Sequence, residues 1–140
     1  MDKTFPKPSI TAELAQKLVD AAVAKAKSLG VPQIVAVLDE SGLLKAFCRM
    51  DGAPLISIEV SQNKAYTALL GAPSHEFYNR IKDNPALAAG LPNLSRIAPF
   101  GGGYPVRIEG SVVAAIGVSG GSVEQDMACA QAALEELAKL

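Results

Sequence analysis

Two glycine clusters in the last third of the chain are the feature best suited to holding a ligand. Pro99–Arg107 reads PFGGGYPVR, and Val112–Gly121 reads VVAAIGVSGG and runs into a helical pattern. Glycine lets a ligand approach the backbone closely, and main-chain N–H groups at a helix start attract anions. The clusters predict a pocket for a flat or anionic small molecule, although tight turns explain the same glycines without a ligand. The candidate ligand-binding residues here are Phe100, Gly101, Gly102, Gly103, Ser119 and Gly120.

Two basic residues could complete such a pocket. Arg49 precedes the Asp51–Gly52 loop, and its guanidinium could clamp a carboxylate through two parallel hydrogen bonds. An ion pair of Arg49 with Asp51 or Glu59 that shapes the loop is the structural alternative. We count Arg49 and Asp51 as candidate ligand-binding residues. Lys64 lies within a helical pattern, and three roles are open to it there. It could bind an anion, exchange protons if it is desolvated, or face solvent.

Tyr104 and His75 are, with Lys64, the candidate catalytic residues. His75 is the only histidine and follows a Pro-Ser pair, so it is either a ligand or proton shuttle or an exposed residue of a first helical turn. Tyr104 either lines the pocket or packs at a subunit contact. One histidine and two distant cysteines, Cys48 and Cys129, predict neither a metal site nor a disulfide framework.

Composition limits the function classes. The 140 residues fit a single domain over 1–140, and 49% hydrophobic residues are enough for a packed core. A net charge of -1 argues against nucleic-acid binding. No apolar run is long enough to span a membrane, and the N-terminus lacks the apolar core of a secretory signal, so we expect a cytoplasmic protein.

The residue pattern predicts an α+β domain in which helices pack on an antiparallel sheet. Helices are expected from Ser9 or Thr11 to Gly30, from a Ser57 cap to Gly71, from a Ser74 cap to Ile81, and after a Ser122–Gln125 capping box. Two hairpins are expected, one from 34–38 and 43–49 and one from 104–108 and 112–118. A fifth strand is expected near 97–101, and residues 83–98 are expected to be irregular.

Several motifs together resemble the GlcG/HbpS-like family, which includes haem-binding proteins and the C-terminal domain of PduO-type corrinoid adenosyltransferases. The resemblance runs in order through nearly the whole chain, from about residue 10 to 138. It is carried by VAVLD at 35–39 with Gly42, RMDGA at 49–53, Ser57, Lys64-Ala65 with Thr67-Ala68, PFGGG at 99–103 with Pro105, Gly110, and AIGVSGG at 115–121 with Gln125-Asp126.

This resemblance implies a profilin-like fold with a five-stranded antiparallel sheet, and homo-oligomers built from dimers. Its leading functional implication is a binding protein for haem, another tetrapyrrole or a planar carboxylated ligand. The alternative is a lyase or deaminase acting on a small aromatic carboxylate such as 4-hydroxylaminobenzoate, and a third option is an accessory oligomer without a ligand. Haem iron needs an axial donor. In this chain the donor could be His75, a tyrosine or a methionine, or protein ligation could be absent.

Overall fold

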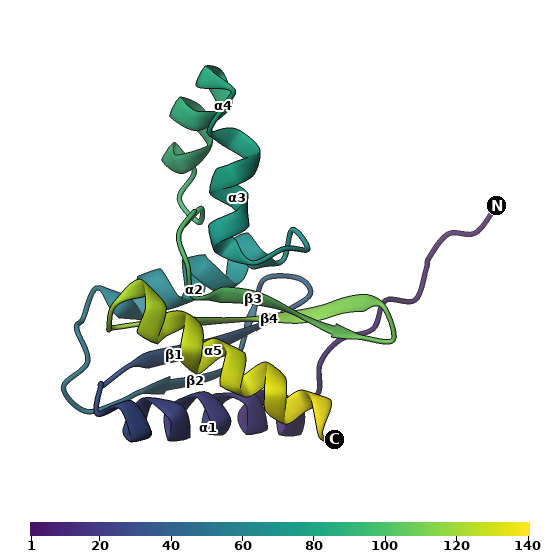
Figure 1. Ribbon diagram of the computed structural model, residues 1–140. Coiled ribbons are helices and arrows are strands. Elements are labelled where there is room, and N and C mark those ends of the chain that lie inside the picture. The colour runs from purple at the N-terminus through teal and green to yellow at the C-terminus, as the bar shows by residue number, and fades with distance from the viewer.

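Four antiparallel strands form the centre of the protein in the computed structural model, which describes residues 1–140 (Figure 1). Their spatial order is β2-β1-β4-β3. The strands are β1 (Ile34–Asp39), β2 (Leu44–Arg49), β3 (Gly103–Ile108) and β4 (Ser111–Ser119). Each expected hairpin forms, and β1 joins the two hairpins by pairing with β4. The expected α+β class with an antiparallel sheet is therefore confirmed.

Helices cover both faces of this sheet (Figure 1). One face carries α1 (Ala12–Leu29) and α5 (Val123–Ala138), and the other carries α2 (Ser57–Ala68). Thr11 caps α1 by accepting a hydrogen bond from the Leu14 N–H, and the expected capping box of α5 is present. None of the helices combines the length and the apolar composition that crossing a bilayer requires.

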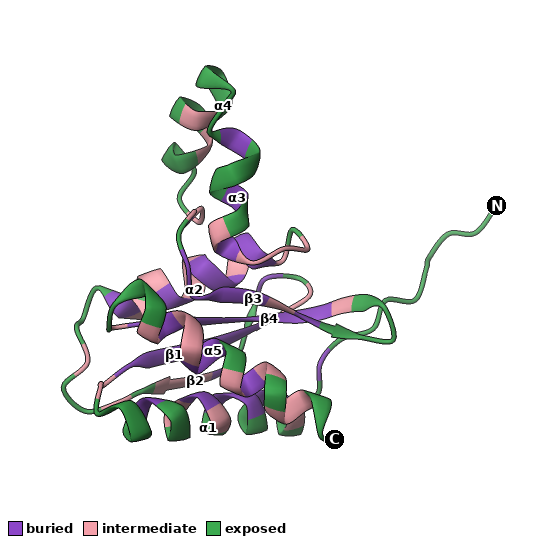
Figure 2. Cartoon of the chain, viewed as in Figure 1, coloured by how far each residue is buried: buried purple, intermediate pink, exposed green.

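The sheet has four strands, so the expected fifth strand near 97–101 is wrong. This segment is held against α2 instead, where the Ala98 N–H donates to the Thr67 hydroxyl at 2.9 Å. Residues 83–98 were expected to be irregular, but they contain two short helical segments, α4 (Pro85–Gly90) and a 3₁₀ turn (Leu91–Asn93). Together with α3 (Ser74–Ile81) they project from the α2 side of the sheet as an arm (Figure 1). Most of its surface is exposed (Figure 2).

Two serines that were expected to cap helices tie helices to strand ends instead. Ile56 and Pro73 occupy the cap positions of α2 and α3, without a side-chain hydrogen bond. Ser57 is buried and accepts a hydrogen bond from the Ser119 hydroxyl at 2.9 Å. Ser74 donates to the Phe100 carbonyl and accepts from the Gly103 N–H. Burial between two elements therefore overrides the capping preference of these serines.

The main core lies between the sheet and the α1–α5 pair. It contains 18 buried residues, including Leu18 of α1, Val37 of β1, Ile116 of β4 and Cys129 of α5. The five residues Ile34–Leu38 of β1 are all buried because this strand has a neighbour on each side and helices on both faces. The core on the α2 side is smaller because the backbone of α2 approaches the sheet closely.

Gly117 permits that approach. A Cβ atom placed on Gly117 would lie 1.8 Å from the Ser61 carbonyl oxygen and 2.8 Å from the Ala65 nitrogen, both in α2. Gly103, its partner across β3 and β4, would place a Cβ atom 2.1 Å from the Lys64 carbonyl oxygen. Contacts this short against helix backbone cannot be relieved by rotating a side chain, so α2 needs glycine at both positions.

We expect Gly117→Ala to destabilise the protein by about 2 kcal/mol or more, because α2 must move away from the sheet. Urea unfolding monitored by circular dichroism measures the change. Gly90→Ala is the matched control, since a Cβ atom there meets nothing within 4 Å. Equal unfolding midpoints for the two variants would show that the close approach of α2 is unimportant.

Candidate functional site

Lys64 is the most unusual side chain in the molecule, because it is charged and only 1% exposed. Its Nζ donates to the Val118 carbonyl oxygen at 2.9 Å and to Asp126 Oδ2 at 2.8 Å. The same nitrogen lies 5.3 Å from the centre of the Phe100 ring. Lys64 of α2 is therefore joined to β4, to α5 and to the loop before β3. The solvated helix face considered for it is wrong.

Asp126 completes this buried pair from the first turn of α5. Its Oδ1 accepts from the Gly121 N–H at 2.9 Å, so both carboxylate oxygens have a partner. A carboxylate near a helix N-terminus also interacts favourably with the helix dipole. Burial lowers the pKa of Lys64 below its ordinary value of 10.5, and the hydrogen bond and charge of Asp126 oppose that shift. Pairing thus offsets part of the cost of burying the ammonium group.

The glycine triplet 101–103 makes room for this pair and for the helices around it. A Cβ atom on Gly102 would lie 2.8 Å from Lys64 Nζ and 2.6 Å from the Val118 carbonyl oxygen. A Cβ atom on Gly101 would lie 2.6 Å from Met127 Sδ. Gly102 also has a φ of +128°, which side chains rarely allow. The space beside these glycines is filled by side chains and backbone of the protein itself.

Ser119 and Gly120 are likewise packed against neighbours. Ser119 is buried and donates its hydroxyl hydrogen to Ser57. A Cβ atom on Gly120 would lie 2.8 Å from the Pro32 carbonyl oxygen, and its φ is +141°. Both residues lie beside the start of α5 and help to close the turn that brings Asp126 to Lys64.

His75 and Tyr104 come together beside the glycine triplet. Their rings meet edge to face with centroids 6.1 Å apart. His75 Nδ1 and the Tyr104 hydroxyl are both buried; His75 Nδ1 has no hydrogen-bond partner, and the Tyr104 hydroxyl has only the Gln131 side chain near it, outside good hydrogen-bond geometry. Unpaired buried polar atoms are costly and uncommon. Burial raises the pKa of the Tyr104 hydroxyl above its ordinary value of 10.0. His75 therefore offers a polar atom that no protein group satisfies.

Arg49 and Asp51 lie at a different place, on the α1 side of the sheet. Together with Lys27 of α1, Cys48 and Met50, they line an open hollow of about 350 Å³. The Arg49 guanidinium has no carboxylate within 4.0 Å, so the ion pairs considered with Asp51 and Glu59 do not form. The structure therefore brings Lys64 and the glycines together, places His75 with Tyr104, and leaves Arg49 and Asp51 elsewhere.

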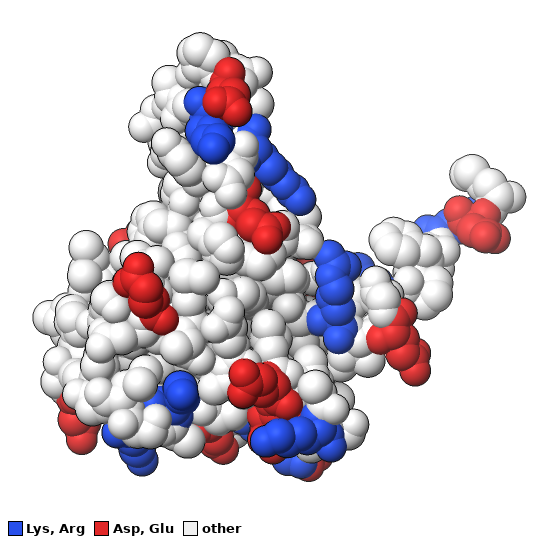
Figure 3. All heavy atoms as spheres, viewed as in Figure 1, with Lys and Arg blue, Asp and Glu red and all other residues white.

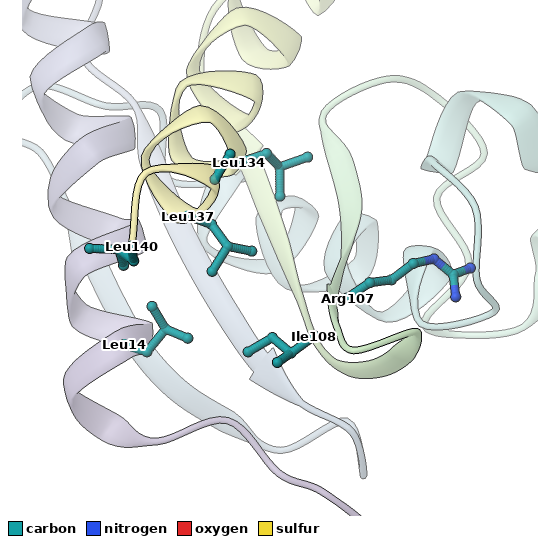
Figure 4. A pocket seen from close by; sticks show the side chains of 7 residues that line it. Leu14, Arg107, Ile108, Leu134, Leu137 and Leu140 are labelled. Carbon is teal, nitrogen blue, oxygen red and sulfur yellow. The ribbon is translucent and has the colours of Figure 1, made fainter.

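Two other hollows contain none of the candidate catalytic or ligand-binding residues predicted from the sequence. One lies between α1, α5 and the β3–β4 hairpin and is lined by leucines, Ile108 and Arg107 (Figure 4). The other lies beneath the arm and contains Arg96. Asp126, the partner of Lys64, was also missed as a site residue. The sequence feature that could have identified Asp126 is its place in the same motif as Ser119 and Gly120.

Acidic and basic side chains are interspersed over the face shown in Figure 3.

Residues 10–135 match the sequence profile of a family described as haem degrading protein HbpS-like. A Citrobacter freundii protein encoded between dhaT and dhaS is 40% identical over the full length of both chains. GlcG of Escherichia coli K12 is 33% identical, over 79% of this chain and 81% of GlcG. The corrinoid adenosyltransferase PduO of Citrobacter freundii is 34% identical over 92% of this chain, which spans only 39% of PduO.

Solved structures show the same fold. Protein ORFY of Klebsiella pneumoniae superposes with a TM-score of 0.91 at 37% identity, over 100% of this chain and 98% of ORFY. The haem complex of PduOC superposes with a TM-score of 0.83 at 35% identity, over 91% and 94% of the two chains. A double mutant of HbpS from Streptomyces reticuli superposes with a TM-score of 0.88 at 31% identity, over 96% of this chain and 91% of HbpS.

We expect Lys64→Met to destabilise the protein by about 3–5 kcal/mol, because it leaves the Asp126 carboxylate buried without a cation. Lys64→Met/Asp126→Leu removes both charges and should regain much of the loss. Chemical denaturation of the two single variants and the double variant measures the coupling. Simple addition of the two single losses would contradict a tightly coupled pair.

The raised pKa of Tyr104 predicts a loss of stability at high pH. The hydroxyl ionises more easily in the unfolded chain than in the fold, so the free energy of unfolding should fall as the pH rises above about 10. Tyr104→Phe should make that fall smaller, whereas the exposed Tyr78→Phe should not. Urea midpoints between about pH 8 and pH 11 test this, and identical slopes for Tyr104→Phe and the unmodified protein would refute it.

Proposed function

Because the chain belongs to the HbpS-like family, we propose that it binds a small molecule, namely haem or another planar carboxylated ligand. The observation that carries this proposal is the haem complex of PduOC, whose fold and sequence match over 91% of this chain. Shared fold alone says little about chemistry. The proposal therefore depends on whether residues of this chain suit the ligand.

The hollow between α1 and β2 is lined by side chains that would suit haem. Lys27 and Arg49 could each pair with a propionate, because no carboxylate lies within 4.0 Å of the Arg49 guanidinium, although Asp51 lines the same hollow. Cys48 and Met50 line the same hollow, and sulfur atoms of both types are axial ligands of haem iron. Met50 Sδ also accepts a hydrogen bond from the Gln33 N–H at 3.3 Å, which orients the thioether. Bound haem would supply an iron centre for ligand exchange or electron transfer.

His75 is the other candidate axial donor. Its Nδ1 is buried and has no hydrogen-bond partner, so no protein group uses this nitrogen. His75 does not line the hollow of Arg49, so ligation by His75 would place the haem beside Tyr104 and the start of α3. The filled space around the glycine triplet makes a ligand seated directly on Gly101–Gly103 less consistent with the geometry.

An enzymatic function has weaker support. A lyase or deaminase would need Lys64 to exchange protons with a substrate, yet its Nζ is held by Val118 and Asp126. None of the hollows on the surface is lined by Lys64. These contacts favour a structural role for Lys64 and a binding role for the protein. Assembly into homo-oligomers built from dimers stays a prediction.

Titration with hemin tests the proposal. We expect a saturable, shifted Soret band at about one ligand per chain or per dimer. Arg49→Ala should weaken binding about tenfold, because a charge-assisted hydrogen bond is lost. Arg80→Ala, an exposed change on the arm, is the matched control. Met50→Leu and His75→Ala should separate the axial donors, since only loss of the true ligand changes the Soret position. Absorbance that rises without saturation would refute haem binding.

A further inference from the structure

The hollow beneath the arm has the form of a small-molecule site. It is open to solvent and has a volume of about 560 Å³, which falls within the usual range for ligand pockets, and six of its eight lining residues are hydrophobic. Tyr66 and Leu70 contribute from α2 and its end, Phe77 from α3, and Leu94 and Ile97 from the segment that returns to the body. Neither the glycine clusters nor the hollow of Arg49 shares these residues.

One cation faces this apolar lining. The Arg96 guanidinium stacks on the Tyr66 ring at 3.9 Å, and its Nη2 donates to the Gly42 carbonyl oxygen at 2.8 Å. This is the only hydrogen bond that the side chain makes to the protein, although a guanidinium carries five N–H donors. No carboxylate lies within 4.0 Å of it, and no lining residue is acidic. Arg96 is thus oriented, half-buried and short of an anion.

Gly42 gives the arginine its place. A Cβ atom on Gly42 would lie 3.2 Å from Arg96 Nη1 and 3.2 Å from the Tyr66 ring, and the φ of Gly42 is +79°. The turn between β1 and β2 therefore leaves room for the stacked pair at the wall of the hollow. Stacking and the hydrogen bond to Gly42 together fix the plane of the guanidinium, so little side-chain freedom is lost when an anion binds.

We propose that this hollow binds a small apolar carboxylic acid, with its carboxylate on Arg96 and its apolar body against Tyr66, Phe77 and Leu94. The charge of the hollow argues for this occupant, since an apolar lining with one unpaired cation matches an apolar molecule with one negative group. The site is distinct from the one proposed for haem or another planar carboxylated ligand, because it uses a separate hollow and a different arginine.

Titration of the full chain with 2-naphthoate, followed by nuclear magnetic resonance shifts and calorimetry, tests the proposal. We expect saturable binding that is about tenfold weaker in Arg96→Ala, because a charge-assisted pair is lost. The uncharged analogue 2-naphthalenemethanol should bind more weakly than the acid. Arg49→Ala should leave naphthoate binding unchanged while weakening hemin binding.

A second variant guards against misfolding of Arg96→Ala. Leu94 is 56% exposed, so Leu94→Glu should fold normally while placing a negative charge at the hollow and repelling the acid. Leu55→Glu is the matched control, since Leu55 is 72% exposed and does not line the hollow. We expect naphthoate binding to be lost in Leu94→Glu and kept in Leu55→Glu.

Three results would overturn the inference. The first is the absence of saturable naphthoate binding, and the second is equal affinity in the unmodified protein and Arg96→Ala. The third is a fall in molecular mass on Leu94→Glu without any naphthoate binding, which would identify the hollow as a contact between copies of the chain. Hemin titration separates the two proposals, since loss of hemin binding with naphthoate binding retained would refute only the haem function.

Discussion

The buried ion pair of Lys64 and Asp126 is the interaction on which the arrangement of this fold depends. It joins α2, on one face of the sheet, to the first turn of α5, on the other face. The Lys64 side chain passes close to Gly102, where a Cβ atom would lie too near its Nζ, so glycine leaves the space that the pair needs. Removing a charge from such a pair costs more than the pair contributes, because the remaining charge stays buried. The motifs at 64–65, 99–103 and 115–126 are therefore parts of a single structural unit.

The fold could be predicted from the sequence largely because its signals are local. Alternating and apolar runs located both hairpins, and the Thr11 and Ser122 caps marked the starts of α1 and α5. Local signals failed where a distant partner decided the outcome. Ser57 and Ser74 resemble caps in sequence, but each is bonded to a strand end far along the chain, Ser57 to Ser119 and Ser74 to Gly103. The expected fifth strand did not form, because Thr67 holds the main chain at Ala98.

The candidate site was harder to predict for the same reason. Glycine is compatible with two opposite arrangements, an open approach for a ligand and a close approach of the protein's own backbone. The sequence cannot distinguish them, and the distances at Gly103 and Gly117 correspond to the second. Arg96 carried no motif that marked it, and its position against Tyr66 arises from the turn at Gly42. Residues that face a hollow depend on tertiary contacts that spacing along the chain does not encode.

The facing pair Gly103 and Gly117 has a consequence for how this chain can change. These adjacent positions of β3 and β4 lack side chains and form a groove that accepts the α2 backbone, with the Lys64 carbonyl oxygen against Gly103 and the Ser61 carbonyl oxygen against Gly117. Any larger residue in the groove would have to be accompanied by a shift of the whole helix, and with it the lysine that spans the sheet. Sequence drift is thereby directed away from this groove and toward the arm and the surface loops.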